Sequence, residues 1–222
     1  MDRKGIVSVI NALDIPLKDE LIYIVTEGVD FWHANSKPRV SGEQYGDHPR
    51  EAVAILSGLW PIPIYVFYGM AAHDAKEHSN DLREIVKIIG PRAGALVEGM
   101  TEDKVIYIKD PELIPDTLDE YRTRKARYHQ KFEEYWGIDP FLIITKFPDL
   151  LHNCRTIQHL MPERQLRYLD EARFFTSFYR IHIIEMRRLF ATSRQIEVVR
   201  GWVHELDAII AEKYPEQAGV CS

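Results

Sequence analysis

Apolar residues recur with helical spacing along nearly the whole chain, and this periodicity limits the folds open to it more than any other feature. Between residues 18 and 34, Leu21, Val25, Val29 and Trp32 fall on one face of a 3.6-residue repeat. This stretch fits the helical period better than the strict alternation of a strand. The sequence therefore predicts an all-α fold.

Prolines, glycines and polar clusters divide the pattern into segments. We expect helices over 18–34, 49–60, 64–76, 80–89, 92–100, 117–136, 141–157, 163–191 and 194–213. Asp47 is expected to cap the second helix, because Pro49 then falls in an early turn where its missing N–H costs little. The segment 64–76 is apolar almost all round, which predicts a central helix.

Residues 36–47 and 101–117 are rich in loop-forming residues, although an isolated VIYI run in the second stretch allows a little extended chain. Neither stretch is long and polar enough to divide the chain convincingly. We therefore expect one compact domain over 1–222, with its motifs between about 20 and 190 and a last helix at about 194–213.

The bulk charge limits the class of partner. The chain of 222 residues has a formal net charge of −6, which argues against nucleic acid or an anionic membrane as a partner. No window approaches a membrane-spanning length, and the N-terminus lacks a secretory apolar run. A cytoplasmic protein is expected, without a disulfide between its two cysteines, Cys154 and Cys221. A small anionic substrate stays possible.

The strongest local signal is the adjacent pair His73 and Asp74. An imidazole and a carboxylate together offer nitrogen and oxygen ligands to a divalent cation, but such a dipeptide is common by chance. His48, at a predicted loop-to-helix junction, supplies a second imidazole. Asp149 supplies a second carboxylate, so that four donors from three helices can form an open metal site.

Spacing within the helix that carries Asp149 places further residues. Asn153 lies four positions later and should share the face of Asp149, whereas Leu151 and His152 should point elsewhere. Pro148 is expected to kink this helix unless it falls within the first turn.

Four segments together resemble a known family. RVSGEQYGDHP (39–49), AAHDAKEH (71–78), EIVKIIGPRAGALVEGMTEDK (84–104) and KFPDLLHNCRTI (146–157) are similar, in order and spacing, to motifs of the RelA/SpoT homologue family. The similarity is to its HD-type hydrolase domain. It implies a bundle of about ten helices that hydrolyses the 3′-pyrophosphate of guanosine tetra- or pentaphosphate. Long members carry a pyrophosphokinase domain afterwards, for which we expect no room in a chain that ends at residue 222.

The resemblance also implies residue roles. His48, His73, Asp74 and Asp149 match the ligands of one divalent ion, Mn²⁺ in the family. Arg39 and Asn153 match residues that contact the nucleotide, and Glu77 matches the acid that helps to activate water. His78 stands where the family has a second carboxylate; it could assist Glu77, with a changed pH profile or substrate.

Three alternatives stay open at this level: a hydrolase of another nucleotide such as an adenine alarmone or NADPH, a silent nucleotide-binding regulatory module, and a purely structural helical protein. The oligomeric state is left open. The remaining charged and aromatic residues fall into four groups. We expect surface or packing roles for His33, His129, His159, His182 and His204, a solvated face for Arg122, Arg124, Lys125 and Arg127, helix core for Phe174, Phe175, Phe178 and Tyr179, and one or two pocket residues among Lys37, Lys76, Lys146 and Arg155.

Overall fold

The computed structural model describes residues 1–36, 38–39, 41–78, 81–102 and 118–213, apart from the side chains of residues 78, 118 and 119. Within these ranges the chain is helical and contains no strand, so the all-α prediction is confirmed. The α-helices are α1 (Arg3–Asn11), α2 (Lys18–Tyr23), α3 (Val29–Trp32), α4 (Asp47–Ser57), α5 (Ile64–Ala71), α6 (Leu82–Ile89), α7 (Pro91–Met100), α8 (Leu118–Ile138), α9 (Leu142–Arg155), α10 (Pro162–Ile181), α11 (Ile183–Arg187) and α12 (Ser193–Lys213).

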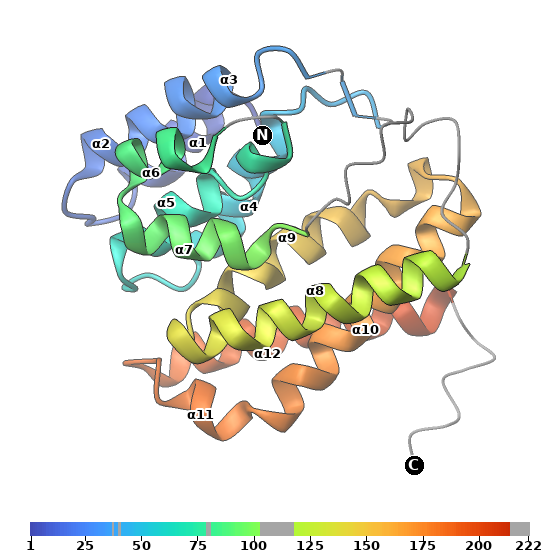
Figure 1. The fold of residues 1–222 in the computed structure, drawn as a ribbon. Coiled ribbons are helices and arrows are strands. Elements are labelled where there is room, and N and C mark those ends of the chain that lie inside the picture. The colour runs from blue at the N-terminus through green and yellow to red at the C-terminus, as the bar shows by residue number, and fades with distance from the viewer. Residues whose placement is uncertain (37, 40, 79–80, 103–117, 214–222) are drawn as a thin grey trace.

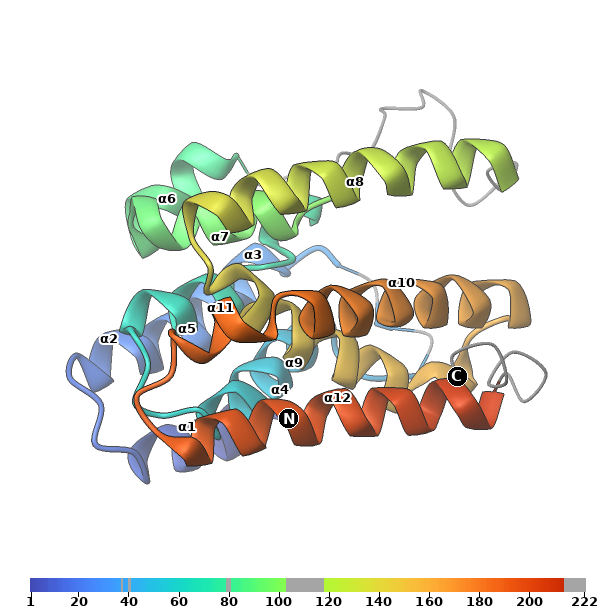
Figure 2. The ribbon, with the colours of Figure 1, turned by 90° about the horizontal axis from the view of Figure 1, so that it is seen from below.

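Helix α9 lies between two groups of helices. Helices α1 to α7 gather on one side of it, and the long helices α8, α10 and α12 run side by side on the other (Figures 1 and 2). Every residue of α9 from Leu142 to Cys154 is buried, and the helix packs against α4, α10 and α12. It is therefore α9 that supplies the centre of the fold, together with the buried but shorter α5.

The predicted helix over 18–34 is interrupted by one wider turn. Between α2 and α3 lies a π-helical turn, Ile24–Gly28. Arg50 of α4 is buried against it, donating from Nε to the Val25 carbonyl at 2.9 Å and from Nη2 to the Thr26 carbonyl at 3.4 Å. These bonds satisfy carbonyl groups at the irregular turn and fix α4 beside it.

Helix α5 ends earlier than expected, at Ala71 rather than residue 76. His73 and Asp74 consequently lie in a turn, which is followed by a short 3₁₀ helix, Ala75–His78. The turn allows two adjacent side chains to face the same centre. In a regular α-helix, adjacent side chains are about 100° apart and would point in different directions. This difference from the sequence-based prediction shapes the site directly.

Other helix ends also differ from prediction. Asp47 is the first residue of α4 and does not cap it; Gly46 occupies the cap position. Asp81 caps α6, accepting from the Arg83 N–H at 2.9 Å, while Ser79 and Asn80 lie outside the described residues. The expected helix over 163–191 is divided at His182, whose backbone leaves the helical region (φ −103°, ψ 19°).

Helix α1 is not among the helices that the sequence predicted. Asp2 caps it, accepting from the Gly5 N–H at 2.8 Å, and Ile6 and Ile10 bury one face a turn apart.

Pro148 lies in the interior of α9, yet the helix continues to Arg155. The expected extended chain in 103–117 and the second cysteine, Cys221, lie outside the described residues; Cys154 is buried with a free thiol.

Two further features concern packing and membranes. A side chain on Gly94 would meet Val86 Cγ2 at 2.3 Å, so α6 and α7 approach too closely there for any residue but glycine. Among the described residues, no helix combines the length and apolarity needed to cross a membrane.

Candidate metal centre and its pocket

Four polar side chains from three segments meet at one point. His48 Nε2, from the first turn of α4, lies 3.0 Å from His73 Nε2 and 3.1 Å from Asp149 Oδ1. Asp74 Oδ1 is 3.2 Å from His73 Nε2, and Asp74 Oδ2 is 3.6 Å from His48 Nε2. The structure thus brings together the four residues that the sequence proposed as ligands, and the interior Pro148 does not carry Asp149 away from them.

Burial sharpens the electrostatics of this cluster. Both imidazoles are nearly inaccessible, His48 at 1% exposure and His73 at 3%. Burial lowers the pKa of His48 to about 4, which leaves it neutral. Burial also opposes the charge of His73, but the Asp74 and Asp149 carboxylates raise its pKa to about 9. A cation entering the site at neutral pH would therefore displace a proton from His73.

The two carboxylates stay ionised despite burial. Desolvation disfavours the charge of Asp74, yet the neighbouring imidazoles of His73 and His48 lower its pKa to about 2. Desolvation acts on Asp149 as well, but the Lys146 ammonium and the two imidazoles hold its pKa well below the usual value. Two anionic groups therefore face the same imidazole pair.

These donors fit a divalent metal ion. One ligand atom each from His48, His73 and Asp74 lies within 4.8 Å of the others, which forms a possible metal-binding group. Asp149 Oδ1 lies beside the two imidazole nitrogens and can complete the set. Mixed imidazole and carboxylate ligation suits ions such as Mn²⁺, Fe²⁺ or Zn²⁺, and the two like charges would be neutralised by one dication.

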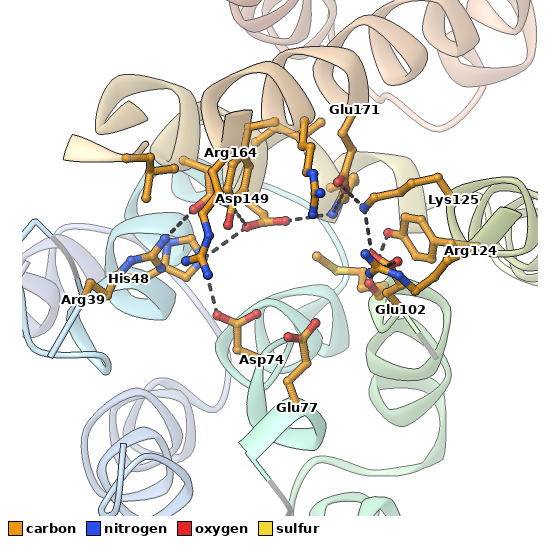
Figure 3. A pocket seen from close by; sticks show the side chains of 18 of the residues that line it. Arg39, His48, Asp74, Glu77, Glu102, Arg124, Lys125, Asp149, Arg164 and Glu171 are labelled. Carbon is orange, nitrogen blue, oxygen red and sulfur yellow. Dashed lines mark hydrogen bonds and ion pairs between the residues drawn. The ribbon is translucent and has the colours of Figure 1, made fainter. Parts of the chain in front are cut away.

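Three of the four residues, His48, Asp74 and Asp149, line one end of a cavity of about 400 Å³. Figure 3 shows His48 and Arg39 at one end, Asp74 and Glu77 beside them, and Arg124 and Lys125 at the far end. A cavity of this size is in the range for a small-molecule ligand. Its lining combines cations, carboxylates and the tyrosines Tyr45, Tyr121, Tyr128 and Tyr168.

The two residues proposed to contact a nucleotide lie together. Arg39 Nη2 donates to Asn153 Oδ1 at 2.6 Å, and Asn153 Nδ2 donates to Asp149 Oδ1 at 2.7 Å. Glu77, from the 3₁₀ helix, lines the same cavity. The side chain of His78 lies outside the described part of the structure.

His152 was expected to be packed and to point away from the face of Asp149; it is packed, but it points toward the site. Its Nδ1 lies 2.8 Å from Nδ1 of His48, and the ring is buried. One of these two nitrogens must donate to the other. This bond at Nδ1 holds the His48 ring so that its other nitrogen, Nε2, points toward His73 and Asp149. Residues three positions apart on a helix are neighbours, so the spacing between Asp149 and His152 itself places His152 near the face of Asp149.

The charged stripe on α8 is only partly solvated, contrary to expectation. Arg122 and Arg127 are exposed, but Arg124 and Lys125 line the cavity. Lys125 Nζ lies 2.7 Å from Glu102 Oε2 and 2.6 Å from Glu171 Oε2. The sequence did contain a signal, since Tyr121, Lys125, Tyr128 and Phe132 share the spacing of one buried helix face.

The other candidate cations separate clearly. Lys146 lines the cavity, whereas Lys76 pairs with Glu98 at 2.6 Å and Arg155 pairs with Glu205 at 2.7 Å. Lys37 lies outside the described residues. The remaining histidines behave as predicted: His33 and His129 stack on Tyr45 and Phe174, His182 lies against Trp136, and His159 and His204 are exposed. The aromatic residues of α10 pack inward as expected.

Part of the chain is similar in sequence to known proteins, although no family model matches it. Over 147 residues it is 32% identical to a probable GTP pyrophosphokinase of Mycobacterium leprae, covering 65% of this chain and 17% of the relative. It is 30% identical over 136 residues to a GTP pyrophosphokinase of Streptomyces antibioticus, covering 60% and 14%. It is 28% identical over 137 residues to the GTP pyrophosphokinase rsh of Brucella ovis, covering 61% and 17%.

The matched segment thus spans about one sixth of each relative. The similarity supports the resemblance to the RelA/SpoT homologue family that the four sequence motifs indicated.

Proposed function

We propose that this protein is a metal-dependent phosphohydrolase that releases pyrophosphate from the 3′ position of guanosine tetra- or pentaphosphate. The observation that carries the proposal is the convergence of two imidazoles and two carboxylates beside a cavity that Arg39 and Glu77 also line. The motif resemblance supports the substrate class, and the geometry of the four side chains supports the proposed reacting centre.

The residues have separate roles in this reaction. His48, His73, Asp74 and Asp149 would hold one divalent ion, which we propose to be Mn²⁺. When bound, such an ion supplies Lewis acidity and lowers the pKa of water. Glu77 accepts a proton from the attacking water, because it lines the cavity close in sequence to Asp74. His78 could assist Glu77.

Arg39 presents a planar guanidinium that can pair with phosphate oxygens, and its bond to Asn153 holds it in the cavity. Asn153 helps to seat the nucleotide. The water oxygen bonds to phosphorus while the bond from phosphorus to the ribose 3′ oxygen breaks. That 3′ oxygen takes up a proton, which yields GDP or GTP and pyrophosphate.

The relatives are named for pyrophosphokinase activity, but this chain matches only about one sixth of their length. Their names therefore do not say which chemistry the shared segment performs. Two incubations separate the directions: guanosine tetraphosphate with Mn²⁺ alone, and GDP with ATP and Mg²⁺. Pyrophosphate and GDP from the first, with no tetraphosphate from the second, would support hydrolysis.

The decisive variant is Asp74→Ala. We expect it to abolish metal-dependent pyrophosphate release while the far-UV circular dichroism spectrum stays helical. Unchanged turnover in this variant would refute the proposed site.

A second substrate class is favoured by one observation in the sequence: His78 stands where the family has a carboxylate. A panel of 3′-pyrophosphorylated guanine and adenine nucleotides and of 2′-phosphorylated NADPH, with product analysis, distinguishes these substrates. Faster turnover of an adenine nucleotide or NADPH than of guanosine tetraphosphate would replace the guanine assignment.

A further inference from the structure

Glu171 of α10 belongs to none of the four sequence motifs, yet it lies at the cavity behind a proposed metal ligand. Its Oε1 is 2.8 Å from Lys146 Nζ, and its Oε2 is 2.6 Å from Lys125 Nζ. Lys146 Nζ in turn lies 3.0 Å from Asp149 Oδ2. Glu171 is thus linked to Asp149 through the ammonium group of Lys146, which pairs with both carboxylates (Figure 3).

The two oxygens of Asp149 are used differently. Oδ2 accepts from Lys146, while Oδ1 accepts from Asn153 at 2.7 Å and lies 3.1 Å from His48 Nε2. This division aims Oδ1 at the imidazole pair. It depends on Lys146, whose long side chain would have several alternative rotamers if only Asp149 held its ammonium group.

Glu171 fixes that ammonium from the opposite side. The side chains of Lys146 and Glu171 are only 7% and 10% exposed, so their pairing is screened weakly by water. Without Glu171, Lys146 would keep a buried positive charge beside a site meant for a dication. Asp149 would then be the carboxylate left for Lys146, in competition with the metal ion.

We propose that Glu171 is a positioning residue for the metal centre: it holds Lys146 so that Asp149 directs Oδ1 toward His48 and His73. The inference rests on the proposed function, since it assumes that the four-residue cluster binds a divalent ion. Residues that orient metal ligands commonly change metal affinity by about 10- to 100-fold when they are substituted.

Co²⁺ is a suitable probe, because its visible absorption reports the ligand geometry independently of turnover. We expect Glu171→Gln in the full chain to weaken Co²⁺ binding by about 10- to 100-fold and to alter the absorption of the saturated site. Glu205→Gln is the matched control: it makes the same charge change in an ion pair with α9 at the surface. It should leave the affinity and spectrum unchanged.

A double variant separates positioning from charge alone. Lys146→Gln with Glu171→Gln restores the net charge and leaves no buried ammonium unpaired, because Lys125 keeps Glu102. If Glu171→Gln does not fold, the double variant still tests the positioning role. Under our proposal its Co²⁺ spectrum stays altered, because nothing fixes Asp149 Oδ2; a wild-type affinity and spectrum would overturn the proposal.

The outcomes also separate this inference from the proposed function. Absence of Co²⁺ binding by the wild-type protein would overturn both. Binding by the wild type that Glu171→Gln leaves unaltered in affinity and spectrum would overturn the positioning role alone.

Discussion

The two ends of the cavity are built on different principles. The ligand end, consisting of His48, His73, Asp74 and Asp149, places two carboxylates around an imidazole pair. The charged wall, consisting of Glu102, Arg124, Lys125, Lys146 and Glu171, alternates acidic and basic groups. The ligand end therefore offers two carboxylates to a cation, whereas the wall pairs its two carboxylates with three cations, one of which, Lys146, also pairs with Asp149.

The difference affects how each end tolerates substitution. A carboxylate at the ligand end is proposed to hold the metal ion, so its removal should affect turnover more than folding. A charged residue of the wall neutralises its ion-pair partners. Removing one partner of a buried pair leaves an uncompensated charge, which destabilises the fold. The wall should thus respond in stability as well as in metal binding.

Beside Asp74→Ala, the largest effect should follow from Asp149→Asn at the ligand end. Loss of one ligand charge removes several kcal/mol of transition-state stabilisation, so we expect turnover to fall by about 1,000-fold or more. Steady-state release of pyrophosphate measures this. A loss of turnover of less than about tenfold, or about 1.4 kcal/mol, would show that Asp149 is not a metal ligand and only pairs with Lys146, as the carboxylates of the wall do.

Phe132→Ala tests how the wall is held. Phe132 is fully buried, with its ring centroid 4.7 Å from that of Phe175 on α10. We expect the free energy of unfolding to fall by about 3–5 kcal/mol, because a large cavity opens between α8 and α10. Urea denaturation gives the value. A change below about 1 kcal/mol would mean that α8 is not anchored through this aromatic cluster.

The pH dependence of stability isolates Glu171. Burial opposes its charge, but Lys125 and Lys146 lower its pKa from 4.5 to about 2. The unfolded chain therefore takes up this proton first, and the stabilisation, complete above pH 4.5, is lost as the pH falls toward 2. This lowering of the Glu171 pKa corresponds to about 3 kcal/mol.

The measurement compares wild type with Glu171→Gln in urea between pH 5 and the acid limit of folding. The variant lacks this titration, so the stability gap between the two proteins should narrow on acidification. A gap independent of pH would show that Glu171 keeps an ordinary pKa in the folded protein.

The smallest effect should come from an ion pair outside both ends. Arg155 and Glu205 join α9 to α12, but their side chains are 43% and 38% exposed. Water screens such a pair, so Arg155→Ala should cost less than about 1 kcal/mol and leave Co²⁺ binding unaltered. Calorimetric unfolding with a Co²⁺ titration checks both. A larger loss would indicate that α12 supports the site through α9.

Sequence periodicity alone determined the all-helical class and most helix positions, because an apolar face at 3.6-residue spacing must be buried whatever it packs against. The donor chemistry of the side chains and the motif resemblance pointed to His48, His73, Asp74 and Asp149 as a possible ligand set, since short motifs keep a donor's local context. Helix ends were less predictable: the early end of α5 places His73 and Asp74 in a turn, and no breaker residue marks that end.

Only the tertiary structure decided which charges are buried. The pairs of Lys125 join residues 23 and 46 positions apart in the chain, and the same stripe of α8 also carries exposed arginines. A charged residue can be buried only where a partner meets it, and the position of that partner depends on how helices pack. The role of Glu171 lies beyond sequence spacing for this reason.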